Sequence, residues 1–311
     1  MGNAVATGTA TAAKTVLRRY FEDAWGRGDL SVLDELIAPE VAVHSQYAHV
    51  EVLPPPGPQA CRDEIGLYRR TFPDLKVEVK DQVADGDRVM TLWEATGTHR
   101  GELLGVPPTG RRVRITSLYF AEVADGRISR TRNTWDALSL YQQLGLTPRT
   151  MPYRNSADPG AWPHHPDTLP HSPHPDPAKR LVQRLFEEVY AGVPGSAEEV
   201  LHPGYRSAEN LAAPVVGGPA LLTARHAELC RAAPGARAVL DAVISEGDQA
   251  AYCWTVHAAT PQGQPFSLMV STLARLRDGR IAETAHRYDA LPFLHATGQE
   301  PPAAGEARLL G

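Results

Sequence analysis

The 311-residue chain contains the same unit twice, and this repeat limits the folds that it can adopt. The tetrapeptide DGRI occupies residues 125–128 and returns at residues 278–281, which is 153 residues later. At the same spacing Asp136 corresponds to Asp289. Further upstream the spacing grows to 161 and then 165 residues while the order of matching residues is kept, as loop insertions in duplicated domains produce. The sequence therefore predicts two domains of one fold.

Hydrophobic periodicity predicts helices first and strands afterwards in each copy. Apolar residues recur at helical spacing between Val16 and Trp25, and the second copy repeats this pattern near Phe186. Two further helices of the first copy are expected at residues 31–37 and 59–71. Alternating patterns predict four strands, at residues 76–83, 88–98, 111–122 and 127–135. Helices followed by an antiparallel meander define an α+β domain.

Proline-rich composition separates the two copies. We expect a disordered N-terminus at residues 1–13, a first domain at 14–147, a Pro/His-rich linker at 148–177, a second domain at 178–299 and a tail at 300–311. Proline fixes φ and removes an amide donor, so the linker cannot form an ordinary helix or a central strand. Its histidines are more typical of an extended spacer than of a metal site, because a metal site needs ligands held by a scaffold.

Charge and cysteine content exclude several classes of partner. The formal net charge is −5 without long blocks of like charge, so neither nucleic acid nor an anionic membrane is an expected partner. The three cysteines are odd in number and lack metal-ligand spacing, which is typical of reduced thiols. The sequence shows neither a signal peptide nor an apolar run of about 18 residues. A cytoplasmic location is therefore predicted.

One block of the first copy is specific enough to suggest a family. The stretch GTHRGELLGVPPTG at residues 97–110 precedes an apolar strand, DGRI and then NTWDALSLYQQLG. This block resembles the SnoaL-like polyketide cyclases of the nuclear transport factor 2-like superfamily. The resemblance implies two tandem cone-shaped α+β barrels, each a curved antiparallel sheet wrapped around helices and an apolar pocket. Domains of this fold also pair through their sheets, so an intramolecular pseudo-dimer and a homodimer are further expectations.

The last strand of the first copy departs from the motif of that family. The run RTRNTWD at residues 130–136 keeps only the final Asp136, and the resemblance places Asn133 where the cyclases have a proton-transferring acid. An amide cannot exchange a proton near neutral pH, although it can hydrogen-bond a carbonyl or enolate oxygen. Asn133 is therefore a predicted substrate-binding residue, and the change argues against ordinary aldol ring closure in this domain.

Asp136 and Asp289 each have two interpretations. Each aspartate directly precedes a predicted helix, where its carboxylate is well placed to cap the first turn. The resemblance instead makes each a candidate catalytic acid. Because side chains alternate along a strand, Asn133 and Asp136 are expected to point to opposite faces. Both interpretations stay open.

The remaining candidates of the first copy are an imidazole that could act as a base and several pocket-lining side chains. His44 follows Val41 and Val43 on a short strand, and an imidazole can act as a general base near pH 7. The predicted substrate-binding residues of this copy are Tyr20, Glu64, Trp93, His99 and Tyr119. The alternatives are surface exposure for Glu64, core packing for Tyr119, and the core or the pocket wall for Trp93. His99 is expected at the pocket mouth, where the alternative is a position without a chemical role.

The second copy has lost the GVPPTG hairpin but carries His286 at the position of Asn133. An imidazole there could act as an acid or base, which makes His286 a fourth catalytic candidate. Its predicted substrate-binding residues are Tyr252, Trp254 and Glu283.

Three functions remain open from the sequence. The leading hypothesis is a cofactor-independent cyclase of specialised metabolism that acts on a hydrophobic polyketide-like small molecule by acid–base catalysis. The first alternative is epoxide opening or ether-ring formation, for which Glu64, Asp136, Glu283 and Asp289 are the available acids. The second alternative is a non-catalytic protein that binds a hydrophobic metabolite. No dinucleotide or phosphate-binding motif is present, and neither a cofactor nor a metal is expected.

Overall fold

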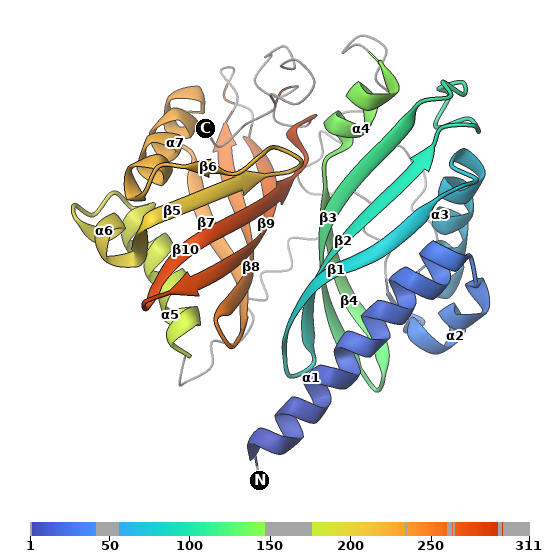
Figure 1. Cartoon of the computed structure of the whole chain (residues 1–311), viewed down its shortest axis with the longest axis horizontal. Coiled ribbons are helices and arrows are strands. Elements are labelled where there is room, and N and C mark those ends of the chain that lie inside the picture. The colour runs from blue at the N-terminus through green and yellow to red at the C-terminus, as the bar shows by residue number, and fades with distance from the viewer. Residues whose placement is uncertain are drawn as a thin grey trace. The chain divides into compact units, whose positions relative to one another are not determined.

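Two compact units, each with its own sheet and helices, make up the chain in the computed structural model (Figure 1). The structure describes residues 2–41, 56–146, 176–233, 235–259, 263, 265–291 and 294. One unit comprises Met1–Trp135 and Ser139–Asn155, and the other comprises Asp136–Leu138 and Ser156–Gly311. The predicted linker and tail lie almost entirely outside the described residues.

The first unit is an antiparallel meander with helices before it and one after it. The helical elements are α1 (Gly2–Arg19), η1 (Tyr20–Arg27), η2 (Leu30–Val32), α2 (Leu33–Leu36), α3 (Pro58–Thr71) and α4 (Ala137–Leu144). The strands are β1 (Lys76–Asp85), β2 (Arg88–Thr98), β3 (Arg112–Ala124) and β4 (Arg127–Trp135), in the sheet order β1-β2-β3-β4. The predicted α+β meander is confirmed. The expectation of disorder before residue 14 was wrong, because α1 begins at Gly2.

The second unit repeats this plan with two additional strands. Its helical elements are α5 (Pro177–Arg184), η3 (Leu185–Val189), α6 (Ser196–Val200) and α7 (Pro219–Ala232). Its strands are β5 (Leu201–Glu209), β6 (Val215–Val216), β7 (Arg237–Glu246), β8 (Gln249–Ala259), β9 (Pro265–Arg277) and β10 (Arg280–Tyr288), in the order β6-β5-β10-β9-β8-β7. An antiparallel sheet was expected for this unit. The β5–β10 pair is parallel, so the sheet is antiparallel except at that pair.

The DGRI repeat has a direct structural cause. Asp125 and Gly126 have φ values of 51° and 74°, and Asp278 and Gly279 have values of 51° and 68°. Two consecutive positive φ values are the signature of the tight hairpin turn that matches the twist of antiparallel strands. Aspartate and glycine tolerate this backbone, so both copies keep the same pair between their last two strands.

A wide helical turn follows the first helix of each unit. The π-helical segment η1 begins at Tyr20, and η3 begins at Leu185, which is 165 residues later. A π turn joins residues i and i+5, whereas an α turn joins i and i+4. In η1 this spacing brings Tyr20 and Trp25 to the same side as Phe21, and all three side chains line one cavity.

The core of the first unit lies between these helices and the inner face of the sheet. Leu17, Phe21 and Ala24 are buried against residues of β1, β2 and β3, including Trp93. Side chains of η1, α3 and the sheet leave an unfilled space between them, which is the cavity described in the next subsection.

Two glycines let the end of β2 approach α3 closely. The Gly101 amide donates to the Thr71 carbonyl (2.9 Å), and a Cβ added at Gly101 would overlap the backbone carbonyl of Arg70. At Gly97 an added Cβ would lie 2.9 Å from Cβ of Phe72. The GTHRG stretch therefore fastens the strand to the C-terminal end of α3.

We expect Gly101→Ala to lower the free energy of unfolding by about 1–3 kcal/mol, because backbone must move to admit the methyl group. Urea denaturation measures this loss. Gly8→Ala is the control, because an added Cβ there meets nothing within 4 Å on a helix. Equal stability of the two variants would contradict the close approach.

Candidate active site

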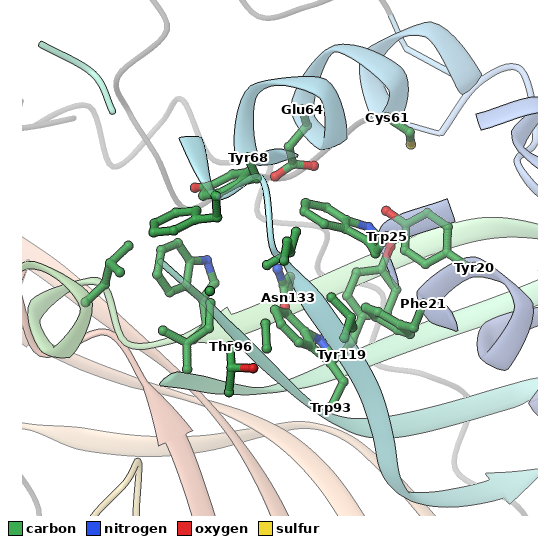
Figure 2. A pocket seen from close by; sticks show the side chains of 18 of the residues that line it. Tyr20, Phe21, Trp25, Cys61, Glu64, Tyr68, Trp93, Thr96, Tyr119 and Asn133 are labelled. Atoms are coloured by element: carbon green, nitrogen blue, oxygen red, sulfur yellow. The ribbon is translucent and has the colours of Figure 1, made fainter. Parts of the chain in front are cut away.

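The first domain contains a cavity of about 870 Å³, including its open mouth, between η1, α3 and the sheet (Figure 2). Most of its wall is apolar or aromatic. The described residues that line it are Tyr20, Phe21, Trp25, Val41, Cys61, Glu64, Tyr68, Phe72, Leu75, Val77, Trp93, Ala95, Thr96, Gly97, Val113, Ile115, Tyr119, Thr131, Asn133, Trp135 and Leu140.

Aromatic rings that pack on one another form much of this wall. Phe21 stacks on Trp93 with 5.4 Å between ring centroids, and it meets Tyr119 edge-on at 5.1 Å. Trp25 and Tyr68 lie 5.8 Å apart on the helical side. Interlocked rings resist rotation, so the cavity offers flat, rigid apolar surfaces. Such surfaces suit a planar, ring-containing ligand.

Glu64 supplies the carboxylate of this wall. It projects from α3 with Cys61 one turn before it and Tyr68 one turn after it, and all three line the cavity (Figure 2). Burial among apolar groups raises the pKa of Glu64 to about 7. Among the described residues no hydrogen-bond partner holds its carboxylate. Glu64 can therefore exchange a proton at neutral pH.

The neighbouring thiol and phenol are not proton-transfer groups at neutral pH. Burial, with a contribution from Glu64, raises the pKa of Cys61 to about 12, so the thiol stays protonated. Burial also raises the pKa of Tyr119 well above its usual range. The Tyr119 hydroxyl can donate a hydrogen bond but cannot act as a base.

Strand β4 contributes side chains, two of them polar, from the sheet side of the cavity. Thr131, Asn133 and Trp135 alternate along the strand and all line the cavity. The Ser117 hydroxyl of β3 lies 2.6 Å from Asn133 Oδ1. Sequence reasoning missed Thr131 and Trp135, although strand alternation around Asn133 could have found them.

Five of the sequence-predicted residues meet in this cavity: Tyr20, Glu64, Trp93, Tyr119 and Asn133. His44 lies outside the described residues. Asp136 is buried but does not line the cavity, so the structure does not bring it together with Glu64.

His99 is not at the cavity mouth, where it was expected. It is fully buried, its ring packs near Phe72, and its Nδ1 accepts a hydrogen bond from the Thr109 amide at 3.2 Å. Burial lowers the pKa of His99, which keeps the ring neutral. His99 thus fastens the GVPPTG hairpin.

The second domain has a smaller cavity, of about 340 Å³ including its open mouth, in the corresponding place. Arg225 is the seventh residue of α7, as Glu64 is of α3, and both helices have 14 residues and begin with proline. Arg225 is buried and paired with Glu209 at 2.6 Å, and Glu209 also accepts a hydrogen bond from the Tyr288 hydroxyl. This cavity therefore has a cation, already neutralised, where the first has an acid.

His286 and Trp254 line this second cavity. Burial, aided by the charges of Arg225 and Arg287, lowers the pKa of His286 to about 3. Its Nδ1 lies 2.8 Å from the Thr272 hydroxyl, which also accepts from the Trp254 indole. A neutral imidazole with so low a pKa is a weak base.

The other candidates of the second domain do not line this cavity. Tyr252 is buried against Phe186. Glu283 pairs with Arg206 at 2.6 Å beside an open groove. Asp289 is buried and accepts a hydrogen bond from the Leu291 amide, as the capping interpretation predicts. Their catalytic or binding roles stay predictions.

Comparisons with known proteins identify the family. The SnoaL-like polyketide cyclase profile matches residues 15–144, and a SnoaL-like domain profile matches residues 182–284. The chain therefore carries two SnoaL-like domains in tandem, of which the first matches the polyketide cyclase profile. No helix among the described residues is long and apolar enough to cross a membrane. The described residues also contain no cluster of three or more metal-ligating side chains.

Curated relatives are enzymes that close rings. The aklanonic acid methyl ester cyclase DnrD of Streptomyces peucetius is 28% identical over 111 residues, which cover 32% of this chain and 77% of DnrD. The nogalonic acid methyl ester cyclase of Streptomyces nogalater is 29% identical over 109 residues, which cover 32% of this chain and 81% of that enzyme. The family profile and these relatives, which are named as cyclases, support a cyclase enzyme.

Solved structures of single-domain length also match. IdmH from Streptomyces antibioticus is 34% identical to the part of this chain that it matches. The match covers 43% of this chain and 99% of IdmH, with a TM-score of 0.39. TsrD from Streptomyces laurentii is 26% identical, covers 43% of this chain and 96% of its own, and has a TM-score of 0.38.

Proposed function

We propose that the first domain closes a ring in a polyketide-like substrate, with Glu64 as the group that transfers the proton. The observation that carries this proposal is a carboxylate with a pKa of about 7 on the wall of an apolar, aromatic cavity. A general base works best when its pKa is close to the pH at which it acts. The reaction needs neither a cofactor nor a second substrate.

The proposed chemistry is an intramolecular aldol addition, in which Glu64 of α3 takes the proton-transfer role that Asn133 of β4 cannot fill. The Glu64 carboxylate takes a proton from a carbon next to a substrate carbonyl, and the C–H electron pair becomes an enolate. The enolate carbon attacks a second carbonyl carbon of the same molecule and forms the new C–C bond. The resulting alkoxide takes the proton back from Glu64, so the product is an isomer of the substrate. The rigid aromatic walls hold the two reacting carbons close together.

Epoxide opening is less well supported. That reaction uses one acid to protonate the epoxide oxygen and a second carboxylate to activate the nucleophile. Among the described residues that line the first cavity, Glu64 is the only acid. The other acids considered from the sequence, Asp136, Glu283 and Asp289, do not line it.

The direct test is incubation of the purified chain with the methyl esters of aklanonic and nogalonic acid, the compounds for which the relatives are named. We expect a product of unchanged mass and altered chromatographic retention, formed without added cofactor. If the chain binds these methyl esters but converts neither of them, the cyclase proposal is refuted and the alternative of a binding protein is favoured.

A variant of the second domain shows which of the two cavities carries out the reaction. If turnover takes place in the first cavity, His286→Gln should retain activity within about twofold, because His286 lines the other cavity and is a weak base. The sequence-based assignment of His286 as catalytic predicts at least a tenfold loss instead. Steady-state rates of this variant decide between the two assignments.

A further inference from the structure

One polar contact in the first cavity fixes the orientation of a side-chain amide. Ser117 is fully buried on β3, and its hydroxyl lies 2.6 Å from Asn133 Oδ1 and 2.9 Å from the Thr134 carbonyl oxygen. A separation of 2.6 Å is usual for an O–H···O bond and short for an N–H···O bond. The amide oxygen of Asn133 therefore faces Ser117, and the NH₂ group faces away from it.

The NH₂ group of Asn133 has no hydrogen-bond partner among the described residues. Asn133 is only partly buried and lines the cavity. The nearby Tyr119 hydroxyl, by contrast, already interacts with the hydroxyls of Thr131 and Tyr20. An amide NH₂ group carries two N–H donors. The NH₂ group of Asn133 is therefore available to donate a hydrogen bond to an acceptor inside the cavity.

We propose that the Asn133 amide, oriented by Ser117, binds the carbonyl oxygen of the substrate that becomes the enolate oxygen. This inference rests on the proposed function. Glu64 projects from the helical side and Asn133 from the sheet, so the proton acceptor and the hydrogen-bond donor approach one substrate from different walls (Figure 2). As Glu64 removes the proton, negative charge develops on the oxygen that the amide holds. A fixed N–H donor in an apolar site stabilises that charge strongly.

The second domain lacks this arrangement. At the 153-residue spacing Ser117 corresponds to Val270 and Asn133 to His286. A valine cannot orient a neighbouring side chain by hydrogen bonding, and His286 is held by Thr272 instead. The oriented amide therefore belongs to the cavity that also contains Glu64. Replacement of the family's acid by Asn133 changes the role of this position from proton transfer to oxyanion binding.

Kinetics test the assignment first. Asn133→Ala should lower kcat about 100-fold or more, which is the usual loss for one oxyanion donor, with little change in KM. Ser117→Ala should lower kcat about tenfold, because the amide is still present but free to rotate. Ser117→Thr keeps the hydroxyl and should restore most of the rate. Ser129→Ala is the matched control, since that hydroxyl on β4 bonds the Glu122 carbonyl and does not line the cavity.

A spectroscopic readout tests the donor independently of turnover. Anthraquinone is a flat, uncharged aromatic diketone, so it suits this wall and does not repel Glu64. A hydrogen bond lowers the infrared stretching frequency of a carbonyl, so bound anthraquinone should show a lowered band that returns toward the free value in Asn133→Ala. If this shift is seen while no methyl ester is converted, the donor assignment holds and the cyclase proposal fails. If the ester is converted but Asn133→Ala keeps the wild-type kcat and band, the donor assignment is wrong.

Discussion

Glu64→Gln should lower kcat/KM by at least 100-fold while leaving substrate affinity nearly unchanged. Glutamine has almost the same size and shape as glutamate but cannot exchange a proton, and general acid–base catalysis commonly contributes about 10²–10⁴ in rate. The comparison is made by steady-state kinetics on the methyl ester substrate. Asp63→Asn is the matched control, because Asp63 is an exposed neighbour on α3 that accepts a hydrogen bond from the Gln59 side chain and does not line the cavity.

The pH dependence gives the same residue a second signature. If ionised Glu64 is the base, kcat/KM of the wild type should rise with pH and level off above a midpoint of about 7. The residual activity of Glu64→Gln should lack this transition. A wild-type rate in Glu64→Gln, or a profile without a transition near neutral pH, would exclude Glu64 as the base.

The raised pKa of Glu64 also has a consequence for stability. Its folded-state pKa of about 7 lies above its ordinary value of 4.5, so the folded state binds the proton more tightly than the unfolded chain does. Wild-type stability should therefore fall relative to Glu64→Gln between about pH 4.5 and pH 7, and the difference should stay constant above that range. Melting temperatures of the two proteins across this range measure the effect.

In the second domain, Glu209→Gln should lower the free energy of unfolding by about 3–5 kcal/mol. Glu209 and Arg225 are both buried, and removal of the acid leaves the guanidinium without a compensating charge. Because the two domains need not unfold together, hydrogen exchange of the α7 and β10 amides is the suitable measurement. Replacement of both residues by methionine should recover much of the loss, since a buried pair can be replaced by apolar side chains.

An exposed ion pair of the same domain provides the control. Glu283 pairs with Arg206 at the same distance of 2.6 Å, but both side chains are substantially exposed to solvent. Glu283→Gln should therefore cost less than about 1 kcal/mol. If Glu209→Gln destabilises the domain no more than Glu283→Gln does, the buried Arg225–Glu209 pair stabilises it no more than the exposed pair does.

Much of the fold could be predicted from the sequence because it depends on local patterns. The repeated Asp-Gly pair marks a hairpin turn in both copies, and alternation along residues 127–135 predicts β4 to its exact ends. The disordered start was mispredicted, because a run of alanine and threonine has no apolar periodicity and yet α1 continues through it from Gly2. The π turn at Tyr20 was also not foreseen, since an apolar face at helical spacing fits both kinds of helix.

The candidate site was predicted only in part. Tyr20, Trp93, Tyr119 and Asn133 follow from face alternation and from the family resemblance, and they do line the cavity. The role of Glu64 could not be ranked, because a glutamate on a helix is usually exposed and the sequence does not show what packs around it.

The sequence by itself determined the duplication, the order of helices and strands, the family and the loss of the motif acid at Asn133. Each depends on residue identity and on short-range spacing. Only the tertiary structure decided that Glu64 has a pKa near 7, that Ser117 orients Asn133, and that Arg225 is neutralised by Glu209. These properties depend on burial and on contacts between residues far apart in the chain, because the free energy of a charge or a hydrogen bond is set by its surroundings in space.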